Sequence, residues 1–203
     1  MNRLLPSFLA LLALAAFLVG CSESDVVRSG GLKSLYGTPA PGAPGGSANV
    51  APGGYAIMGP PTITAERIDK VLCAAGSPAC NTGKNLYDAA VERGIDPVAA
   101  LAFFRKESTY GTKGVARATK GLGNIRCAGW SGRCIEGFRA YDSWAEGYRD
   151  WANLISVQYV QVWKLTTVDT IVRAYAPAAE NNTSLYIQQV EQYMDQFRQG
   201  GAA

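Results

Sequence analysis

The chain of 203 residues contains no histidine, and this absence excludes several common active sites. A Ser–His–Asp triad, a Cys–His dyad and a histidine-ligated catalytic zinc all need an imidazole. The sequence also has no nucleotide fingerprint and no phosphate-binding loop. Its net charge of +3 is small and unclustered, so a nucleic-acid partner is not indicated. We therefore expect any chemistry to rest on carboxylates and tyrosines, with no metal or cofactor.

The N-terminal apolar run predicts export rather than a permanent membrane span. Arg3 supplies a positive charge, and Leu9–Leu18 is too short to cross a bilayer as a helix. The sequence LVGC at Leu18–Cys21 has the form of a bacterial lipobox. We interpret residues 1–20 as a lipoprotein signal peptide; an ordinary signal peptide with an incidental cysteine is the alternative.

Cys21 is accordingly expected to carry a lipid that anchors the chain to a bacterial membrane. Ser22, where an aspartate would indicate inner-membrane retention, favours the periplasmic side of the outer membrane in a Gram-negative host. Residues 21–61 are rich in Gly, Pro, Ala and Ser, a composition typical of a flexible linker. Residues 62–199 then have a suitable length for one core, and we expect a monomer.

The remaining four cysteines form two pairs with the same CX6C spacing, Cys73/Cys80 and Cys127/Cys134. In an exported protein such a set favours two short-loop disulfides. A zinc site is the competing interpretation, although the spacing is not CxxC. Four cysteines allow three pairings, so the connectivity stays open at this stage.

Residues 62–199 are expected to form an α+β fold that is mainly α. Good N-cap residues and apolar side chains at helical spacing predict helices starting near residues 64, 84, 97, 144, 168 and 184. The glycine-rich stretch 109–142 is expected to be a loop or a small β-hairpin inserted after the third helix.

The third helix ends on one carboxylate, Glu107. Asp96 is a good N-cap and Pro97 suits the first helical position. Partial burial and the negative end of the helix dipole would both raise the pKa of Glu107, as a general acid requires. Arg105 and Lys106 would oppose this shift if they pointed the same way. By position alone, however, a solvated surface glutamate is the commoner case.

Two features of the following lobe indicate a ligand site. Gly121–Ile125 is typical of backbone placed close to a ligand, although a plain glycine loop is equally compatible. Trp130 lies inside the Cys127–Cys134 loop, where an aromatic ring suits stacking against a sugar. Further aromatic rings follow, but their helical spacing favours the core for most of them: Tyr141, Trp144, Tyr148 and Trp151.

Four segments in order carry a resemblance to a known family. They are ALAFFRKESTYGT, GLGNI, FRAYDSWAEGYRDWANLI and VRAYAPAAENNTSLYIQQVEQYM. Together they resemble the glucosaminidase domain of glycoside hydrolase family 73, over residues 62–198. The resemblance implies a lysozyme-like α+β fold that cleaves bacterial cell-wall glycan. The two cysteines of the inserted lobe depart from the family pattern and would reshape the cleft.

The resemblance also implies roles for individual residues. Glu107 matches the catalytic glutamate, and Tyr175 matches the tyrosine that supports catalysis. Asn124 matches the asparagine of a G-N-(L/I) segment; we expect it to bind substrate together with Trp130 and with Ser108, the neighbour of Glu107. A second carboxylate is sometimes placed ahead of the FRxY segment, where Glu136 is the nearest candidate and a solvated loop glutamate is the alternative.

The expected activity is that of an endo-β-N-acetylglucosaminidase, which cuts the β-1,4 bond after N-acetylglucosamine in peptidoglycan. Glu107 would protonate the leaving oxygen. The expected partners are peptidoglycan glycan strands and, through Cys21, a membrane. A lytic transglycosylase on the same fold is the nearest alternative. A non-catalytic lipoprotein that binds peptidoglycan is the alternative from another class.

Overall fold

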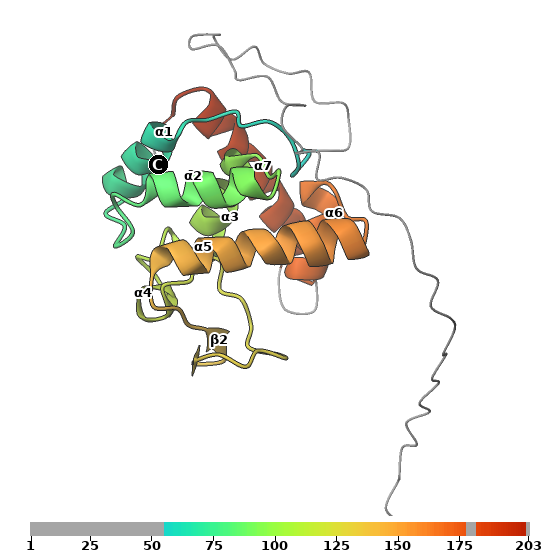
Figure 1. The fold of residues 1–203 in the computed structure, drawn as a ribbon. Helices are drawn as coiled ribbons and strands as arrows, with labels where there is room; N and C mark the ends of the chain where they lie inside the picture. Colours follow the sequence, from blue (N-terminus) through green and yellow to red (C-terminus); the bar gives the residue numbers. More distant parts are fainter. Residues whose placement is uncertain (1–54, 178–181, 202–203) are drawn as a thin grey trace, which may run out of the picture. The chain divides into compact units, whose positions relative to one another are not determined.

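The computed structural model describes residues 55–177 and 182–201, which form a mainly helical domain with one small antiparallel sheet (Figure 1). The elements in chain order are α1 (Ala65–Ala74), α2 (Gly83–Glu92), α3 (Pro97–Ser108), α4 (Ala116–Thr119), β1 (Cys134–Ile135), β2 (Phe138–Arg139), α5 (Trp144–Asn153), the π-helix η1 (Leu154–Val162), α6 (Val168–Tyr175) and α7 (Thr183–Arg198). The expected mainly α content with a small β part is confirmed. The predicted signal peptide, Cys21 and residues 22–54 of the predicted linker lie outside the described residues.

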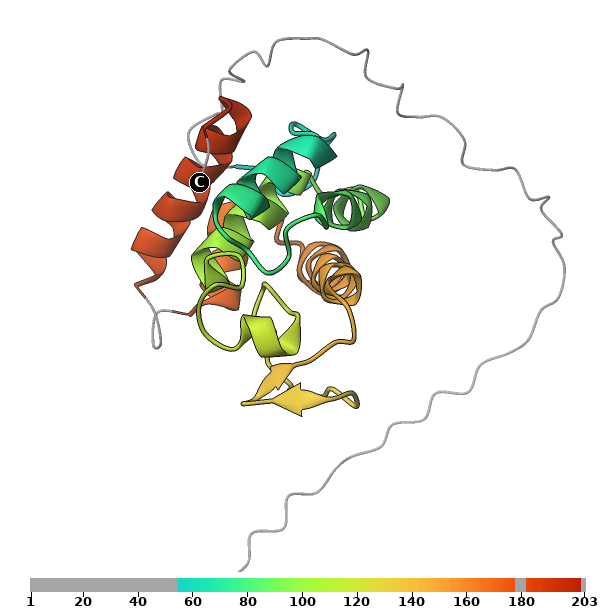
Figure 2. The ribbon, with the colours of Figure 1, turned by 90° about the vertical axis from the view of Figure 1, so that its left-hand side faces the viewer.

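Helix α3 is the centre of the core. Figure 2 shows α7 on one side of it and α5 on the other. The sequence indicated one buried face, but every side chain from Ala99 to Phe104 is at most 2% exposed. The run PVAALAFF is apolar on all sides, as a helix enclosed by others requires. The last turn of α3 therefore emerges from the middle of the domain.

The predicted N-caps form as expected. Side chains of Thr64, Asp96, Ser143 and Thr167 each accept a hydrogen bond from a backbone N–H two or three residues later. Thr167 is also part of a reciprocal capping box with Thr170. These contacts satisfy N–H groups that have no partner within the helix, so local chemistry fixes where four helices begin.

The folded part begins earlier than the sequence suggested. Residues 55–61, which we assigned to the linker, pack against the domain. Ile57 is fully buried, and the hydroxyl of Tyr55 donates to Asp195 at 2.6 Å. Met58 forms a β-bridge with Ile95. The apolar side chains of this short segment are what separates it from the Gly- and Pro-rich residues before it.

Helix α5 continues into nine residues of π-helix, where the sequence predicted a regular α-helix. The wider turns of η1 bury Ile155, Ser156 and Tyr159. They bring the ring of Tyr159 to 6.0 Å from the ring of Tyr175. Across residues 55–177 and 182–201, no helix combines the length and apolarity needed to cross a bilayer.

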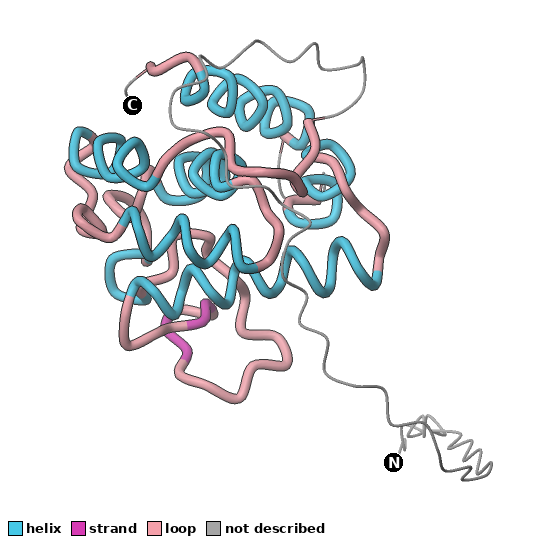
Figure 3. The backbone as a smooth tube through the Cα atoms, turned by 45° about the horizontal axis from the view of Figure 1, so that its top comes forward, coloured by secondary structure: helices cyan, strands magenta, loops and turns pink. Residues whose placement is uncertain are grey.

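The glycine-rich stretch, for which the sequence left a loop or a small hairpin open, contains the short helix α4 and the β1–β2 hairpin. Figure 3 shows the two strands at one edge of the helical part. Glu136 and Gly137 form the two-residue turn, both with positive φ. Both expected disulfides are present, Cys73–Cys80 and Cys127–Cys134. The second one closes the loop that leads into β1.

Candidate active site around Glu107

The N-terminus of α3 is held firmly, and this fixes the direction in which its last turn points. Asp96 is 3% exposed and accepts hydrogen bonds from the backbone of Val98 and from both the backbone and the hydroxyl of Thr62. Arg198 of α7 pairs with the same carboxylate at 3.1 Å. At the other end, Thr109 adopts the left-handed conformation and stops the helix one residue after Ser108.

Glu107 is half-buried in that last turn, and Tyr186 of α7 donates a hydrogen bond to its Oε1 at 2.5 Å. Burial raises the pKa of the Glu107 carboxyl above its ordinary value. The hydrogen bonds from Tyr186 and Asn124, and the charges of Lys106 and Arg126, oppose this shift without cancelling it. The expected upward shift is thus present, with burial as its largest cause.

The loop Gly121–Ile125 lies against the end of α3. Asn124 donates from Nδ2 to the main-chain oxygen of Glu107 at 3.0 Å. Its other amide atom, Oδ1, is buried and has no hydrogen-bond partner within the described residues. A buried acceptor without a partner is uncommon in folded proteins, so the contacts within the fold leave this amide oxygen unexplained.

Gly123 is required for this close approach. A Cβ at this position would lie 2.4 Å from the ring of Trp151 and 3.2 Å from that of Phe104. No larger residue fits without moving an aromatic side chain of the core. The sequence interpretation of this segment as backbone near a ligand was made from its glycines; the structure shows that Gly123 is needed for packing against Trp151.

Tyr175 and Ser108 fasten the same loop from two sides. The Tyr175 hydroxyl donates to the carbonyl of Gly123, and Ser108 Oγ donates to the carbonyl of Leu122 at 2.9 Å. Burial and the nearby charge of Glu107 raise the pKa of Tyr175 well above its ordinary value, so its hydroxyl keeps its proton. Ser108 is 2% exposed. Both residues therefore position the loop in this conformation, and Ser108 has no open path to a substrate.

Tyr186 was not among the predicted site residues, although it makes the shortest contact to Glu107. Its ring packs 6.0 Å from that of Phe103, and the side chain is 3% exposed. The available signal was its spacing, because Tyr186 lies four residues before Val190 and eight before Met194 on the inner face of α7. That spacing predicts burial but does not predict the contact to a carboxylate 79 residues earlier.

Two predicted residues lie elsewhere. Glu136 is exposed in the hairpin turn. Trp130 is half-buried, with the guanidinium of Arg139 4.7 Å from its ring centre and the ring of Tyr141 at 6.2 Å. Within the described residues, neither Glu136 nor Trp130 bonds to Glu107, and no other acidic side chain is among the groups that shift its pKa. The expected core positions of Tyr141, Tyr148 and Trp151 are confirmed, and Trp144 packs against the core while half-buried.

The arrangement can act as a single acid. A protonated carboxyl at the end of a buried helix can donate to a basic oxygen, Tyr186 keeps that carboxyl oriented, and Asn124 holds the main chain of Glu107. A scan against known protein families found no family model that matches the chain, and a search of curated proteins found no matching sequence.

Proposed function

We propose that the chain is a peptidoglycan hydrolase with a lysozyme-like fold, an endo-β-N-acetylglucosaminidase in which Glu107 is the general acid. The observation that carries the proposal is the half-buried Glu107, whose pKa is raised by burial and whose Oε1 accepts from Tyr186. A carboxyl that holds its proton toward neutral pH is what protonation of a glycosidic oxygen requires. Three further features support a glycan substrate outside the cytoplasm. They are the resemblance of the four sequence segments to glycoside hydrolase family 73, the predicted lipoprotein signal at Cys21 and the two disulfides.

In the proposed reaction, Glu107 gives its proton to the oxygen that links two sugars. The bond from that oxygen to C1 breaks, and its electron pair stays on the leaving oxygen. A second group must then meet the positive charge that develops at C1. Among the described residues no carboxylate faces Glu107, which favours attack by the N-acetyl oxygen of the substrate itself, followed by water.

Asn124 suits this substrate-assisted course. Its Oδ1 is buried and unpaired in this conformation; a small turn of the side chain toward the substrate would let it accept a hydrogen bond from the N–H of an N-acetyl group and orient the carbonyl oxygen of that group toward C1. Tyr175 contributes by holding Gly123, and through it the position of Asn124. Tyr175 is then a positioning residue rather than a proton donor.

A lytic transglycosylase is the second candidate, and the same lack of a described second carboxylate favours it. There, the 6-hydroxyl of the sugar attacks C1 in place of water and forms an anhydro ring. The two activities give products that differ by one water. Mass spectrometry of fragments released from purified sacculi by the full chain therefore separates them.

The test compares wild type with Glu107→Gln, which keeps the size of the side chain and removes its acid. Glu92→Gln on the exposed end of α2 is the matched control. We expect hydrolysis products, with a reducing end, from wild type and from the control, and no fragments from Glu107→Gln. Release of anhydro fragments would assign the transglycosylase. Binding to sacculi without release by any of the three proteins would favour a non-catalytic lipoprotein.

A further inference from the structure

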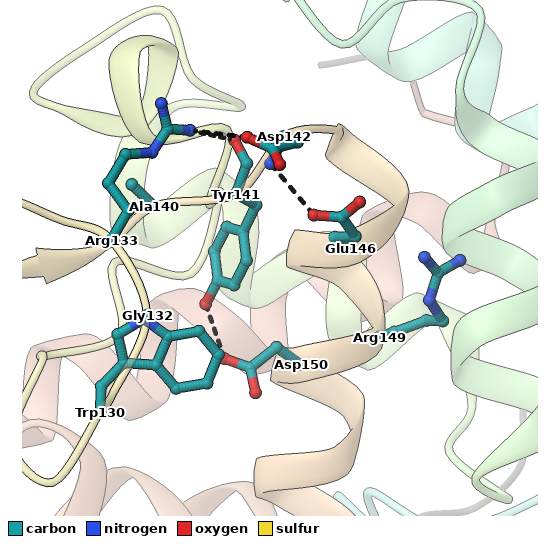
Figure 4. A pocket seen from close by; sticks show the side chains of 9 residues that line it. All are labelled: Trp130, Gly132, Arg133, Ala140, Tyr141, Asp142, Glu146, Arg149 and Asp150. Atoms are coloured by element: carbon teal, nitrogen blue, oxygen red, sulfur yellow. Dashed lines mark hydrogen bonds and ion pairs between the residues drawn. The ribbon is translucent and has the colours of Figure 1, made fainter.

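A hollow of about 310 Å³ lies between the loop that carries Trp130 and the first turns of α5 (Figure 4). Its aromatic lining residues are the half-buried Trp130 and Tyr141, which is 6% exposed. Polar side chains from the loop, from the turn before α5 and from α5 surround these rings: Arg133, Asp142, Glu146 and Asp150. Glu107, Asn124 and Tyr175 do not line it, so the hollow is separate from the candidate active site.

The floor of the hollow is fixed before any ligand arrives. Asp150 accepts from the hydroxyl of Tyr141 at 2.7 Å and pairs with Arg139 at 3.0 Å. The side chains of Asp150 and Arg139 are both 17% exposed. Since the pair is largely shielded from water, it holds its geometry better than a surface ion pair. Figure 4 shows the indole of Trp130 and this carboxylate among the side chains that line the hollow.

The rim carries further polar contacts, although Arg133 and Asp142 form a more exposed pair than Asp150 and Arg139. Arg133 donates to the carbonyl of Tyr141 at 2.8 Å and to Asp142 at 3.3 Å. Glu146 accepts from the backbone N–H of Asp142 at 3.0 Å. The loop bearing Trp130 is closed by the Cys127–Cys134 disulfide. The shielded Asp150 pair and the disulfide-closed loop are the preformed parts of the site, and preformed parts lose little conformational freedom on binding.

The charges around the hollow balance, which indicates a neutral ligand. Asp150 is paired with Arg139 and Asp142 with Arg133, which leaves the acidic Glu146 and the basic Arg149. A carboxylate or a phosphate would find no excess of positive charge. A ring with one apolar face and hydroxyl groups around its edge fits better, because indole contacts the face while carboxylates and guanidinium groups bond the edge.

We propose that this hollow binds one neutral N-acetylhexosamine unit of a glycan strand, at a distance from the bond that Glu107 would cleave. The inference rests on the proposed function in taking glycan as the ligand. A short link joins the two places: Arg139 donates to the main chain of Arg126, whose charge acts on Glu107. A strand bound in the hollow would stay attached to the hairpin lobe between cleavage events.

The test uses the full chain with Glu107→Gln, so that the probe is not consumed. The probe is the tetramer of N-acetylglucosamine, and the readouts are the indole N–H resonance of Trp130 and the amide resonance of Gly132. We expect both to shift on titration and to saturate. The matched control is the indole of Trp163, which is 49% exposed outside the hollow and should not respond.

Substitutions sharpen the same test. Trp130→Ala should weaken tetramer binding at Gly132 roughly five-fold, and Trp130→Phe should restore most of it, because ring contacts add about a kcal/mol. Trp163→Phe should leave the affinity unchanged. Partial rescue by phenylalanine separates lost stacking from a misfolded loop.

Three results decide the matter. Shifts at Asn124 and Tyr186 without any at Trp130 and Gly132 would overturn the inference, since glycan would then bind only beside Glu107. A response to a free stem tripeptide but not to the tetramer would also overturn it. If wild type releases no fragments from sacculi while Trp130 still responds to the tetramer, the hydrolase proposal fails and the saccharide site stands.

Discussion

Glu107 and Glu136, the two carboxylates that the sequence offered for one reaction, lie in opposite kinds of surroundings. Glu107 ends a helix whose preceding turns are enclosed by the core, and its carboxyl contacts Tyr186. Glu136 is exposed in a two-residue hairpin turn with φ of 50°. Burial changes the protonation of the first, whereas water surrounds the second.

The difference lies in what surrounds each acid rather than in the acid itself. Around Glu107, hydrogen bonds from Tyr175 and Ser108 hold the Gly121–Ile125 loop, and the loop in turn places Asn124. Glu136 and Gly137 form the tight turn of the hairpin, and both have positive φ. The turn alone accounts for these two residues, so no catalytic role is needed to explain them. A catalytic acid needs a fixed environment, and only one of the two glutamates has one.

The largest expected effect is on activity. Glu107→Gln should lower kcat/KM on sacculi by about 10²- to 10⁴-fold, the usual contribution of a general acid. Glu136→Gln should stay within about two-fold of wild type, because an exposed turn residue gives up no fixed contact. Fragment release measured under initial-rate conditions checks both. A loss in Glu136→Gln as large as that in Glu107→Gln would break the contrast and restore Glu136 as the second carboxylate.

Local features of this structure were predictable from the sequence. The caps at Asp96 and Thr167 depend on residues two or three positions away, so their chemistry is visible in a short window. The short-loop disulfides were favoured for the same reason. The hydrogen bond from Tyr186 to Glu107 joins residues 79 positions apart, and only the packing of α7 on α3 creates it.

At Ser108 and in η1 the structure differs from the sequence expectation because of contacts between distant residues. Ser108 was expected to face substrate, but the direction of its side chain depends on a loop that returns to the helix fourteen residues later. The apolar pattern does not predict the π-helical turns of η1, because the same pattern fits an α-helix. Tertiary contacts decided both cases, and neither has a local sequence signal.

Two glycines, Gly123 near Glu107 and Gly137 next to Glu136, allow the same comparison by stability. Gly123→Ala should destabilise the fold by about 1–3 kcal/mol, because its Cβ would overlap Trp151, and should disturb the placement of Asn124. Gly137→Ala meets open space and only the strain of positive φ, about 1–2 kcal/mol. Urea unfolding gives the stabilities, and activity on sacculi should fall for Gly123→Ala alone. Equal activities in the two variants would show that the loop tolerates movement.

A smaller effect is expected from the tyrosine that contacts the acid. Tyr186→Phe removes a hydrogen bond that lowers the pKa of Glu107, so that pKa should rise and the fall of kcat/KM at high pH should move to higher pH. We expect about a ten-fold loss of activity below that limb, from poorer orientation of the carboxyl. Tyr193→Phe, on the same helix and stacked on Arg105, is the control and should leave the pH profile unchanged. A pH profile of Tyr186→Phe that coincides with wild type would contradict the role assigned to Tyr186.

The smallest expected effect is on stability: Glu107→Gln should stabilise the fold, although it should remove the activity. The pKa of Glu107 is raised in the folded state above its ordinary value of 4.5. Between the two pKa values the unfolded chain has lost this proton while the folded chain keeps it, so the free energy of unfolding falls as pH rises. Above the folded-state pKa, the folded chain must bury the charged carboxylate. Glu107→Gln avoids this cost, so its urea midpoint should be higher than that of wild type at pH 8, with little gain at pH 3, where the carboxyl is largely neutral in both states. Glu136→Gln, at an exposed position, should match wild type at both values. Urea midpoints at the two pH values measure the difference, and a Glu107→Gln variant less stable than wild type at pH 8 would mean that the contact with Tyr186 outweighs the burial of charge.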